Sequence, residues 1–456
     1  MSDYETLRQQ HLGQFFGVML ELAQHLSWPR EQIEQEQTRR LRRTVTAARD
    51  KSAWHRQRLA HVDVQTLTAA DLPSLPVMTK DDLMTHWNEI VTDPRLNLDL
   101  VNRHLETITR DAYLLESYHA IASGGSSGRR GVFVWDWDGW ATAYAALVRW
   151  PFRYAANGPT VPAGAQSTIA SVAADSPTHM TSAMTQTFAT PVAPVLRFPV
   201  TMPLHQIVAG LNAVQPNSLT GYSSALFELA REAKQGRLTI APRTVTFTGE
   251  PLSPEMRAAV EEAWRVPVGG SWGTSEGCVV GQSCFLDTGM HLAEDVLIVE
   301  PVDHDGAAVP VGEISAKIYL TNLMNQALPL IRYEITDSVR VLAEPCACGS
   351  TFARVDDIQG RVEDILRYDN GVSVFPHVFG SVLSRQPQII EYQVRQTPKG
   401  ADVLVRAVDE VDLDALASRI TAQVEKAGLP GPEVTISRVA TIERTSAGKL
   451  KRYVPL

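Results

Sequence analysis

The sequence has few cysteines and lacks the long apolar runs, internal repeats and low-complexity tracts that mark several protein classes. Four cysteines in 456 residues are too few for a disulfide-stapled secreted scaffold. The most apolar early stretch, FFGVMLELAQHL (residues 15–26), is too short to span a bilayer and contains Glu21. It predicts an amphipathic helix. The net charge of -9 argues against a general nucleic-acid binder. We therefore expect a soluble protein that binds neither membranes nor nucleic acid.

The first residues, MSDYETLRQQ, are polar and acidic, without the basic segment and apolar core of a signal peptide. We therefore expect a cytoplasmic protein. The composition, with 44% hydrophobic and 20% charged residues, is ordinary for a globular chain, and the length predicts two or three domains.

One loop has the composition of a phosphate site without either common phosphate motif. The stretch SGGSSGRRG (residues 123–131) has neither the Walker spacing nor the dinucleotide-binding spacing. Small residues let backbone N–H groups approach an anion closely, so the loop is a candidate phosphate cradle. A flexible surface turn is the alternative interpretation.

Residues 130–340 alternate between strand-like and helix-like segments, which predicts an α/β fold with largely parallel sheets. NSLTGY (217–222), TVTFTGE (244–250) and PVGGSWG (267–273) are the predicted strands. A helix ending at Gly236 follows the first, and a helix with Ser253 as N-cap and Pro254 at its first position follows the second. Because sites in such sheets lie outside the carboxyl ends of strands, TGE and SWGTSE are expected there.

The last hundred residues predict a small α+β unit that begins near QGRVEDIL (359–366). IIEYQVRQT (389–397) and ADVLVRAV (401–408) flank PKG as a hairpin. The segment LDALASRITAQVEKAG (413–428) predicts a helix that stops at its glycine, and EVTISRVATI (433–442) predicts another strand.

Five stretches occur in the order and spacing of the adenylate-forming superfamily, which contains acyl-CoA synthetases, adenylation domains and luciferases. They are SGGSSGRRG, TGEPLS (248–253), SWGTSEG (271–277), LIRYEITDSV (330–339) with GRVEDIL (360–366), and RTSAGKLKR (444–452). Within the superfamily the chain most resembles the phenylacetate-CoA ligase branch, through LPVMTKDDL (75–83), QPNSLTGYSSALFELA (215–230) and GMHLAEDVLIVEPVD (289–303). The resemblance covers nearly the whole chain. It implies a large N-terminal domain (1–362) with mixed parallel sheets and helices, and a small mobile α+β C-terminal domain (363–456).

The resemblance implies an ATP site formed by the motifs. In it the small loop residues, with Arg129 or Arg130, hold the β- and γ-phosphates, the TGEP and SWGT segments form the adenine slot, and an acid and an arginine bind the ribose. Trp272 replaces the tyrosine usual in the family, and Thr336 replaces the usual glycine. The residues that the resemblance assigns to ATP are Ser123, Gly125, Ser126, Ser127, Gly128, Arg129, Gly249, Glu250, Pro251, Ser271, Trp272, Gly273, Thr274, Asp337 and Arg361.

Five further residues receive roles from the same resemblance. Glu276 is the expected Mg²⁺ ligand and Lys449 the expected catalytic lysine that bridges the carboxylate and the α-phosphate. Glu363 lies at the hinge position, where relatives usually have Asp or Lys. His179 and Tyr222 are expected at the acyl pocket. The simpler alternatives are a helix-start acid for Glu276, a solvated tail lysine for Lys449 and a structural histidine for His179.

The cysteines suggest a second metal. Cys284, His291, Cys346 and Cys348 together offer three thiolates and one imidazole, a set that suits tetrahedral Zn²⁺. Some ligases that the chain resembles carry a structural zinc in the corresponding region. Free buried thiols are the alternative. Cys278 is left over and is expected to pack near the nucleotide site.

The sequence therefore predicts an ATP- and Mg²⁺-dependent, AMP-forming ligase that activates a small carboxylic acid, aromatic by resemblance, and passes it to coenzyme A. Two alternatives stay open. The same adenylate could pass to an amine or a carrier-protein thiol, or the enzyme could activate another oxyanion such as nitrite. A non-catalytic nucleotide-binding protein is the rival of a different class. A homodimer is possible by resemblance.

Overall fold

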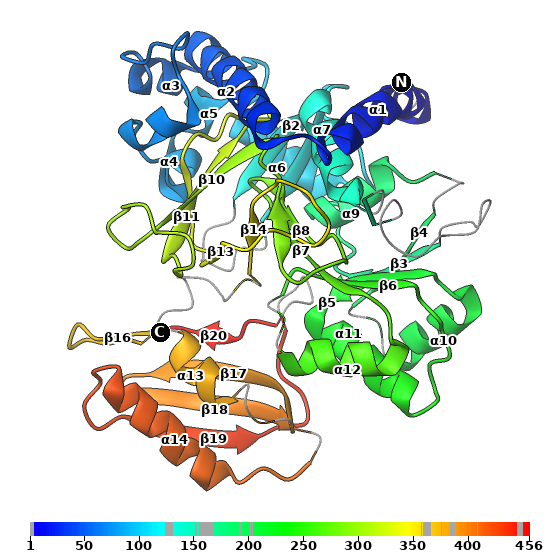
Figure 1. The fold of residues 1–456 in the computed structure, drawn as a ribbon, viewed down its shortest axis with the longest axis vertical. Helices are drawn as coiled ribbons and strands as arrows, with labels where there is room; N and C mark the ends of the chain where they lie inside the picture. Colours follow the sequence, from blue (N-terminus) through cyan, green and yellow to red (C-terminus); the bar gives the residue numbers. More distant parts are fainter. Residues whose placement is uncertain are drawn as a thin grey trace.

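The computed structural model describes residues 4–123, 131–150, 153–154, 168–190, 194–200, 202, 204–250, 252, 254–356, 358, 366–374, 376–383, 386, 388–407, 409–444 and 450–456. The segments before the glycine-rich loop are mainly helical, and the early apolar run, up to His25, lies in the first helix, where a helix was predicted (Figure 1). These elements are α1 (Tyr4–His25), α2 (Arg30–Lys51), α3 (Ala53–Arg58), the 3-10 helix Ala69–Ser74, α4 (Lys80–Thr85), α5 (Trp87–Ile90) and α6 (Leu98–Thr107).

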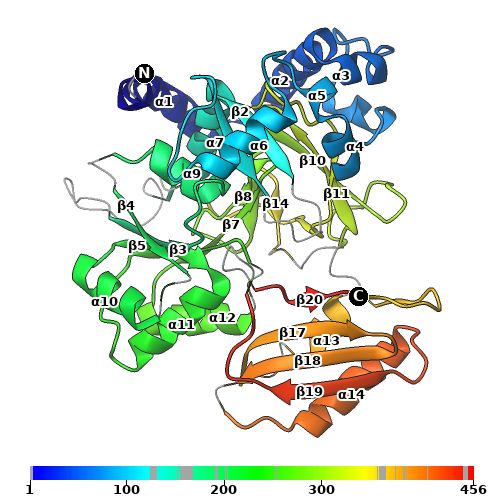
Figure 2. The same ribbon diagram turned by 180° about the vertical axis from the view of Figure 1, so that it is seen from behind.

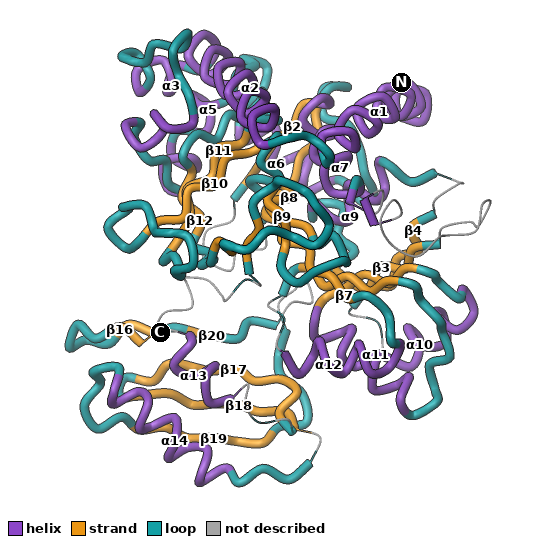
Figure 3. The backbone as a smooth tube through the Cα atoms, in the orientation of Figure 1, coloured by secondary structure: helices purple, strands orange, loops and turns teal. Residues whose placement is uncertain are grey.

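A nine-stranded sheet with the order β13-β14-β9-β8-β7-β6-β5-β3-β4 crosses the middle of the molecule (Figures 1 and 3). The neighbours from β7 to β4 are parallel, and the remaining pairs are antiparallel. Its strands are β3 (Ile169–Ala173), β4 (Val195–Pro199), β5 (Ser218–Tyr222), β6 (Thr244–Thr248), β7 (Val268–Thr274), β8 (Cys278–Gln282), β9 (Met290–Leu292), β13 (Val341–Leu342) and β14 (Arg354–Val355).

Helices connect the parallel strands, as the alternating sequence pattern predicts. Helices α10 (Leu204–Val214), α11 (Ser223–Lys234) and α12 (Pro254–Trp264) pack their apolar faces with this part of the sheet in one hydrophobic core. Gly236 has a φ of +73° just after α11, so it ends that helix as predicted. Helices α7 (Trp137–Val148) and α9 (Met180–Thr187) belong to a second, larger core with β8.

Two smaller sheets complete this part of the chain. Strands β1 (Tyr118–Ala122) and β2 (Val132–Asp136) form an antiparallel hairpin on either side of the glycine-rich loop. Strands β10 (Leu297–Val302), β11 (Lys317–Asn322) and β12 (Tyr333–Ile335) form an antiparallel sheet of three.

The C-terminal elements form a four-stranded sheet, with the order β19-β18-β17-β20, and a two-stranded sheet of β15 and β16, and they have a core of their own (orange and red in Figures 1 and 2). The predicted hairpin and helix are present, and Gly428, with a φ of +103°, follows the helix. Gly400 on β18 lies opposite Glu433 on the parallel strand β19. A Cβ at position 400 would lie 2.0 Å from the Glu433 carbonyl oxygen, so this pairing requires glycine there. The elements are β15 (Leu366–Arg367), β16 (Ser373–Val374), α13 (Pro376–Leu383), β17 (Ile389–Thr397), β18 (Gly400–Ala407), α14 (Leu413–Lys426), β19 (Glu433–Arg438) and β20 (Tyr453–Val454).

A buried ionic triad joins the N-terminal helices to the larger core. Arg149 donates from both terminal nitrogens to Asp295, at 2.5 and 2.7 Å, and neither side chain is exposed. His25 Nδ1 lies 2.8 Å from the same carboxylate. Burial alone would raise the pKa of Asp295, but the Arg149 guanidinium, followed by His25, lowers it well below its usual range. The triad therefore depends on a charged carboxylate.

Candidate functional site

Two of the predicted nucleotide motifs, TGE and SWGTSE, meet at one edge of the large sheet. Tyr222, Thr248 and Thr274 end the strands β5, β6 and β7, which are parallel neighbours. Because parallel strands end at the same edge, Tyr222, the TGE segment and the SWGTSE segment lie along one rim. Gly249 has a φ of +72°, a conformation that glycine adopts without strain, and it turns the chain away from the sheet there.

Two motif residues that are 65 positions apart are joined by a hydrogen bond. Trp272 Nε1 donates to Asp337 Oδ2 at 2.8 Å, and both residues are buried, with 5% and 4% of their surfaces exposed. The indole therefore does more than present a ring face, because its N–H holds the carboxylate that the resemblance assigns to the ribose.

The turn between β7 and β8 holds Glu276 by its backbone. Asn322 on β11 is fully buried and donates from its amide to the Glu276 carbonyl oxygen at 2.8 Å. The Thr274 hydroxyl accepts a hydrogen bond from Gly277 N at 3.0 Å. A Cβ at Gly273 would lie 2.7 Å from the Cys278 carbonyl oxygen, so this turn needs glycine there. The backbone of the Glu276 turn is thus fixed by partners on two strands.

The base of the glycine-rich loop is closed by reciprocal hydrogen bonds. Ser123 N donates to the Gly131 carbonyl oxygen at 2.9 Å, and Gly131 N donates to Ser123 Oγ at 2.8 Å. Next to it, Ala122 N donates to the Thr178 carbonyl oxygen at 2.9 Å. Because His179 follows Thr178 and is the N-cap of α9, the predicted pocket gate is tied to the strand that enters the loop.

Tyr222 precedes α11 and is buried, and the half-buried Glu250, from the segment after β6, contacts the first residues of this helix. Burial raises the pKa of Tyr222 to about 12, so this side chain stays a neutral phenol. The Glu250 carboxylate accepts from Ser224 N at 3.0 Å and, from the C-terminal unit, from Leu450 N at 3.1 Å. Ser223 Oγ donates to the Glu250 carbonyl oxygen at 3.1 Å. The Glu250 side chain therefore faces the C-terminal unit.

Ten of the predicted site positions, and the predicted N-cap Ser253, lie outside the described residues, so their roles stay predictions. The ten site positions are Gly125, Ser126, Ser127, Gly128, Arg129, Arg130, Pro251, Arg361, Glu363 and Lys449.

The four predicted zinc ligands, from distant parts of the chain, converge in one buried cluster. Their ligand atoms lie within 4.8 Å of one another, with 3.6 Å between the sulfurs of Cys284 and Cys346 and 3.4 Å between Cys348 Sγ and His291 Nε2. Zinc bonds of about 2.0–2.3 Å in a tetrahedron place ligand atoms roughly 3.5–3.8 Å apart. The donor set and its spacing therefore fit Zn²⁺.

Partners around the cluster orient its ligands. His291 Nδ1 donates to the Phe352 carbonyl oxygen at 3.0 Å, which leaves Nε2 directed at the sulfurs. The imidazole ring stacks on Trp150, with 4.4 Å between the ring centroids. Two backbone N–H groups also point at cluster sulfurs, Cys348 N at Cys346 Sγ and Ser350 N at Cys348 Sγ, both at 3.4 Å. The Cys284 sulfur, followed by His291, lowers the pKa of the Cys348 thiol below its usual range. A thiolate is the form of cysteine that binds metal.

Cys278, the cysteine left over, packs against a different element. Its sulfur lies 3.4 Å from Met184 Sδ on α9, and burial raises the pKa of its thiol. It is therefore a neutral packing group beside the Glu276 turn.

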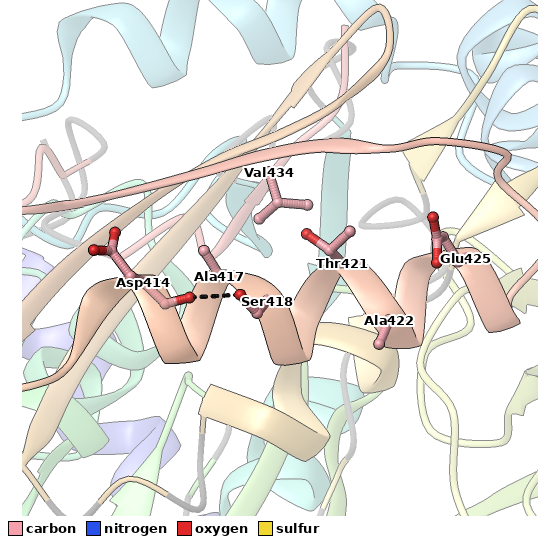
Figure 4. Close-up of a pocket in the computed structure, with 7 residues that line it drawn as sticks. All are labelled: Asp414, Ala417, Ser418, Thr421, Ala422, Glu425 and Val434. Carbon is pink, nitrogen blue, oxygen red and sulfur yellow. Dashed lines mark hydrogen bonds between the residues drawn. The ribbon is translucent and has the colours of Figure 1, made fainter.

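A hollow on the outer face of α14 lies away from all these motifs (Figure 4). Its lining mixes polar and small apolar side chains, with an acid near each end and a hydrogen bond from Ser418 to the Asp414 carbonyl oxygen. The lining residues are Asp414, Ala417, Ser418, Thr421, Ala422, Glu425 and Val434.

Sequence reasoning missed Asn322 and the contacts between the C-terminal unit and α11. Asn322 precedes no recognisable motif, and its role follows only from its position on β11 next to the Glu276 turn. Arg406 and Glu228 form an ion pair between residues 178 positions apart. Neither periodicity nor spacing carries a signal for such a pair.

Comparison with known proteins points to one superfamily. No family model matches the chain. A phenylacetate-coenzyme A ligase of Thermus thermophilus is 28% identical over 262 residues, which are 52% of this chain and 58% of that protein. The Escherichia coli phenylacetate-coenzyme A ligase is 33% identical over 153 residues, 33% of this chain and 34% of that protein. The chain thus matches about half of the first relative and about a third of the second.

A solved structure extends the likeness to nearly the whole chain. The crystal structure of 2-hydroxyisobutyryl-CoA ligase in its postadenylation state matches with a TM-score of 0.74 and 18% identity, covering 94% of this chain and 91% of that one. The same ligase in its thioesterification state gives a TM-score of 0.61. The predicted resemblance to the adenylate-forming superfamily and its phenylacetate-CoA ligase branch is confirmed. Within the described ranges, no helix has the length and hydropathy needed to cross a bilayer.

Proposed function

We propose that the protein is an AMP-forming acid–thiol ligase that activates a small carboxylic acid with ATP and transfers the acyl group to coenzyme A. The observation that carries the proposal is the Trp272–Asp337 hydrogen bond, which unites two nucleotide motifs at the carboxyl edge of the sheet. The sequence relatives are ligases of this kind and support the acceptor and an aromatic acid as the substrate class.

The first half-reaction joins the acid to AMP. A carboxylate oxygen of the acid attacks the α-phosphorus of ATP, and the bond to the bridging oxygen breaks to release pyrophosphate. Asp337, held by Trp272, accepts hydrogen bonds from the ribose hydroxyls and so fixes the α-phosphorus relative to the acid. In this proposal the acid lies beside His179, at the start of α9, and Tyr222, at the end of β5.

Charge builds on phosphate oxygens during this attack, so the site needs cations. The Glu276 carboxylate, on a turn fixed by Asn322, is the residue that would hold Mg²⁺, which prefers oxygen ligands. Bound there, the ion would neutralise phosphate charge. Loop residues between Ser123 and Gly131 and the side chain of Lys449 complete the proposed cradle.

The second half-reaction forms the thioester. The thiolate of coenzyme A attacks the acyl carbon, and AMP leaves with the bridging oxygen. We assign residues 363–456 to a lid that rotates about Glu363 between the two steps. The larger TM-score with the postadenylation state than with the thioesterification state supports assigning the lid orientation seen here to the adenylation side.

The cysteine cluster has a separate, structural role in this proposal. Zn²⁺ held by Cys284, Cys346, Cys348 and His291 would fill all four positions of a tetrahedron, leaving none for substrate. The cluster shares a small core with Leu26, which follows α1, and Ile33 on α2, so the metal would fasten this N-terminal region to the sheet.

The test is ATP–pyrophosphate exchange across a panel of aromatic and aliphatic acids, followed by product analysis with coenzyme A, amines and a carrier protein as acceptors. The proposal expects exchange with at least one aromatic acid and a thioester product only with coenzyme A. An amide or a carrier-bound product would show that the acceptor is an amine or a carrier protein and not coenzyme A. Absence of exchange with every acid would overturn the proposed function.

A further inference from the structure

The C-terminal unit is fastened to α11 by a network of charged side chains, of which Glu228, Glu391 and Arg406 lie outside the sequence motifs. Ser224 and Glu228 lie one turn apart on α11 and face the unit together. From the unit, Arg406 on β18 donates to Glu228, and Arg444 donates to the Ser224 hydroxyl at 3.0 Å. Arg444 also lies 3.5 Å from Glu250. These contacts cross from one unit to the other.

Glu391 organises both arginines from within the C-terminal unit. It stands opposite Arg406 in the β17–β18 register and accepts from Arg406 Nε at 2.7 Å. Its other oxygen accepts from Arg444 Nη2. The Glu391 side chain is only 3% exposed, whereas those of Arg406 and Arg444 are 18% and 28% exposed. A buried carboxylate thus holds two cations in the positions from which they reach the large unit.

Glu250, on the large unit, contacts the C-terminal unit at Arg444 and Leu450. Arg444 and Leu450 pair with each other as an isolated bridge, and both contact the Glu250 carboxylate. They flank residues 445–449, which end at the predicted catalytic Lys449. Glu250 therefore anchors both flanks of the segment that carries this lysine.

We propose that Glu228, Glu250, Glu391, Arg406 and Arg444 form an interdomain latch that holds the lid in its present orientation and so favours adenylation over thioester formation. The inference rests on the proposed function for the identity of the two half-reactions. Glu228, Glu391, Arg406 and Arg444 position the lid and lie outside the predicted ATP site, whereas Glu250 also belongs to the predicted adenine slot. Since the lid must leave this orientation for the second step, loss of the latch shifts the equilibrium toward the other orientation.

The test uses Arg406→Gln, Glu228→Gln and the double variant in the full-length protein, because neither residue lies in the proposed catalytic site. Lys399→Gln is the matched control, since Lys399 pairs with Glu433 on the exposed surface of the lid alone. We expect each single variant to slow pyrophosphate exchange roughly five- to tenfold, and the double variant to be no slower than either single one. Thioester formation from a preformed acyl-adenylate, with phenylacetyl-adenylate as the first probe, should stay within about twofold or accelerate.

A distance measurement tests the latch without turnover. Fluorophores on Gln235→Cys, after α11, and Lys426→Cys, at the end of α14, report the lid orientation, because both positions are exposed and all four native cysteines are buried. Arg406→Gln should add a second distance population that Lys399→Gln does not. An unchanged distribution, additive effects, or equal slowing of both half-reactions would overturn the latch. A wild type without exchange activity would overturn the proposed function instead, and the distance distribution would still decide whether the latch exists.

Discussion

The hydrogen bond between Trp272 and Asp337 makes the sharpest prediction about the nucleotide site. Trp272→Phe keeps an aromatic face but removes the N–H that donates to the buried carboxylate at 2.8 Å. A hydrogen bond to a charged group contributes about 1.5–3 kcal/mol. At about 1.4 kcal/mol for each factor of ten, kcat/KM for ATP should fall about 10- to 150-fold. The loss should appear mainly as a higher KM for ATP, since ribose binding is what the carboxylate serves.

The assay is pyrophosphate exchange at varied ATP, with thermal unfolding as the control for folding. Asp337→Asn and the double variant complete a cycle, and we expect the Trp272 substitution to cost little once Asp337 is changed. Trp272→Phe within twofold of the wild type, or a coupling below about 0.3 kcal/mol, would refute the reasoning.

Three further predictions concern other parts of the molecule. Metal analysis should find about one zinc per chain, and Cys346→Ser should lower the unfolding temperature far more than it changes exchange, because a closed four-ligand site is structural; a folded, metal-free protein with freely titrating Cys284, Cys346 and Cys348 would contradict this. Lys449→Ala should reduce pyrophosphate exchange roughly a hundred- to a thousandfold while thioester formation from preformed acyl-adenylate persists; equal slowing of both steps would make the lysine structural. Because the pKa of Asp295 is lowered in the folded state, its stabilisation is complete above the usual carboxyl pKa of about 4 and is lost as pH falls through the folded value. Asp295→Asn should therefore lower the free energy of unfolding by about 3–5 kcal/mol at pH 7, as measured by denaturant unfolding. Below pH 4 the stability of this variant should fall less steeply with pH than that of the wild type. A variant with the wild-type pH profile would exclude this carboxylate as the cause.

The local pattern of the sequence was sufficient to predict most of the strands and helices around the site. The strands that end at Tyr222, Thr248 and Thr274 were predictable from short β-rich runs between helices, and the rim where they end follows from the parallel arrangement. The C-terminal hairpin and helix were predictable because period-two and period-3.6 patterns are separated there by glycine and proline. The zinc ligands were predictable as a chemical set, although nothing in their spacing required them to meet.

The pairings between distant residues were decided only by the tertiary structure. The sequence marks Trp272 as a departure from the family's tyrosine, but only the packing of β7 against the segment after β12 shows that its N–H meets Asp337. Likewise, nothing local distinguishes Glu228, Glu391 or Arg406 from ordinary surface charges, since their partners lie on another unit. The sequence by itself determined which elements form and which chemistry the chain carries, because propensity, periodicity and motifs are local. The tertiary structure decided which side chains hold one another, because a hydrogen bond or an ion pair depends on distance in space.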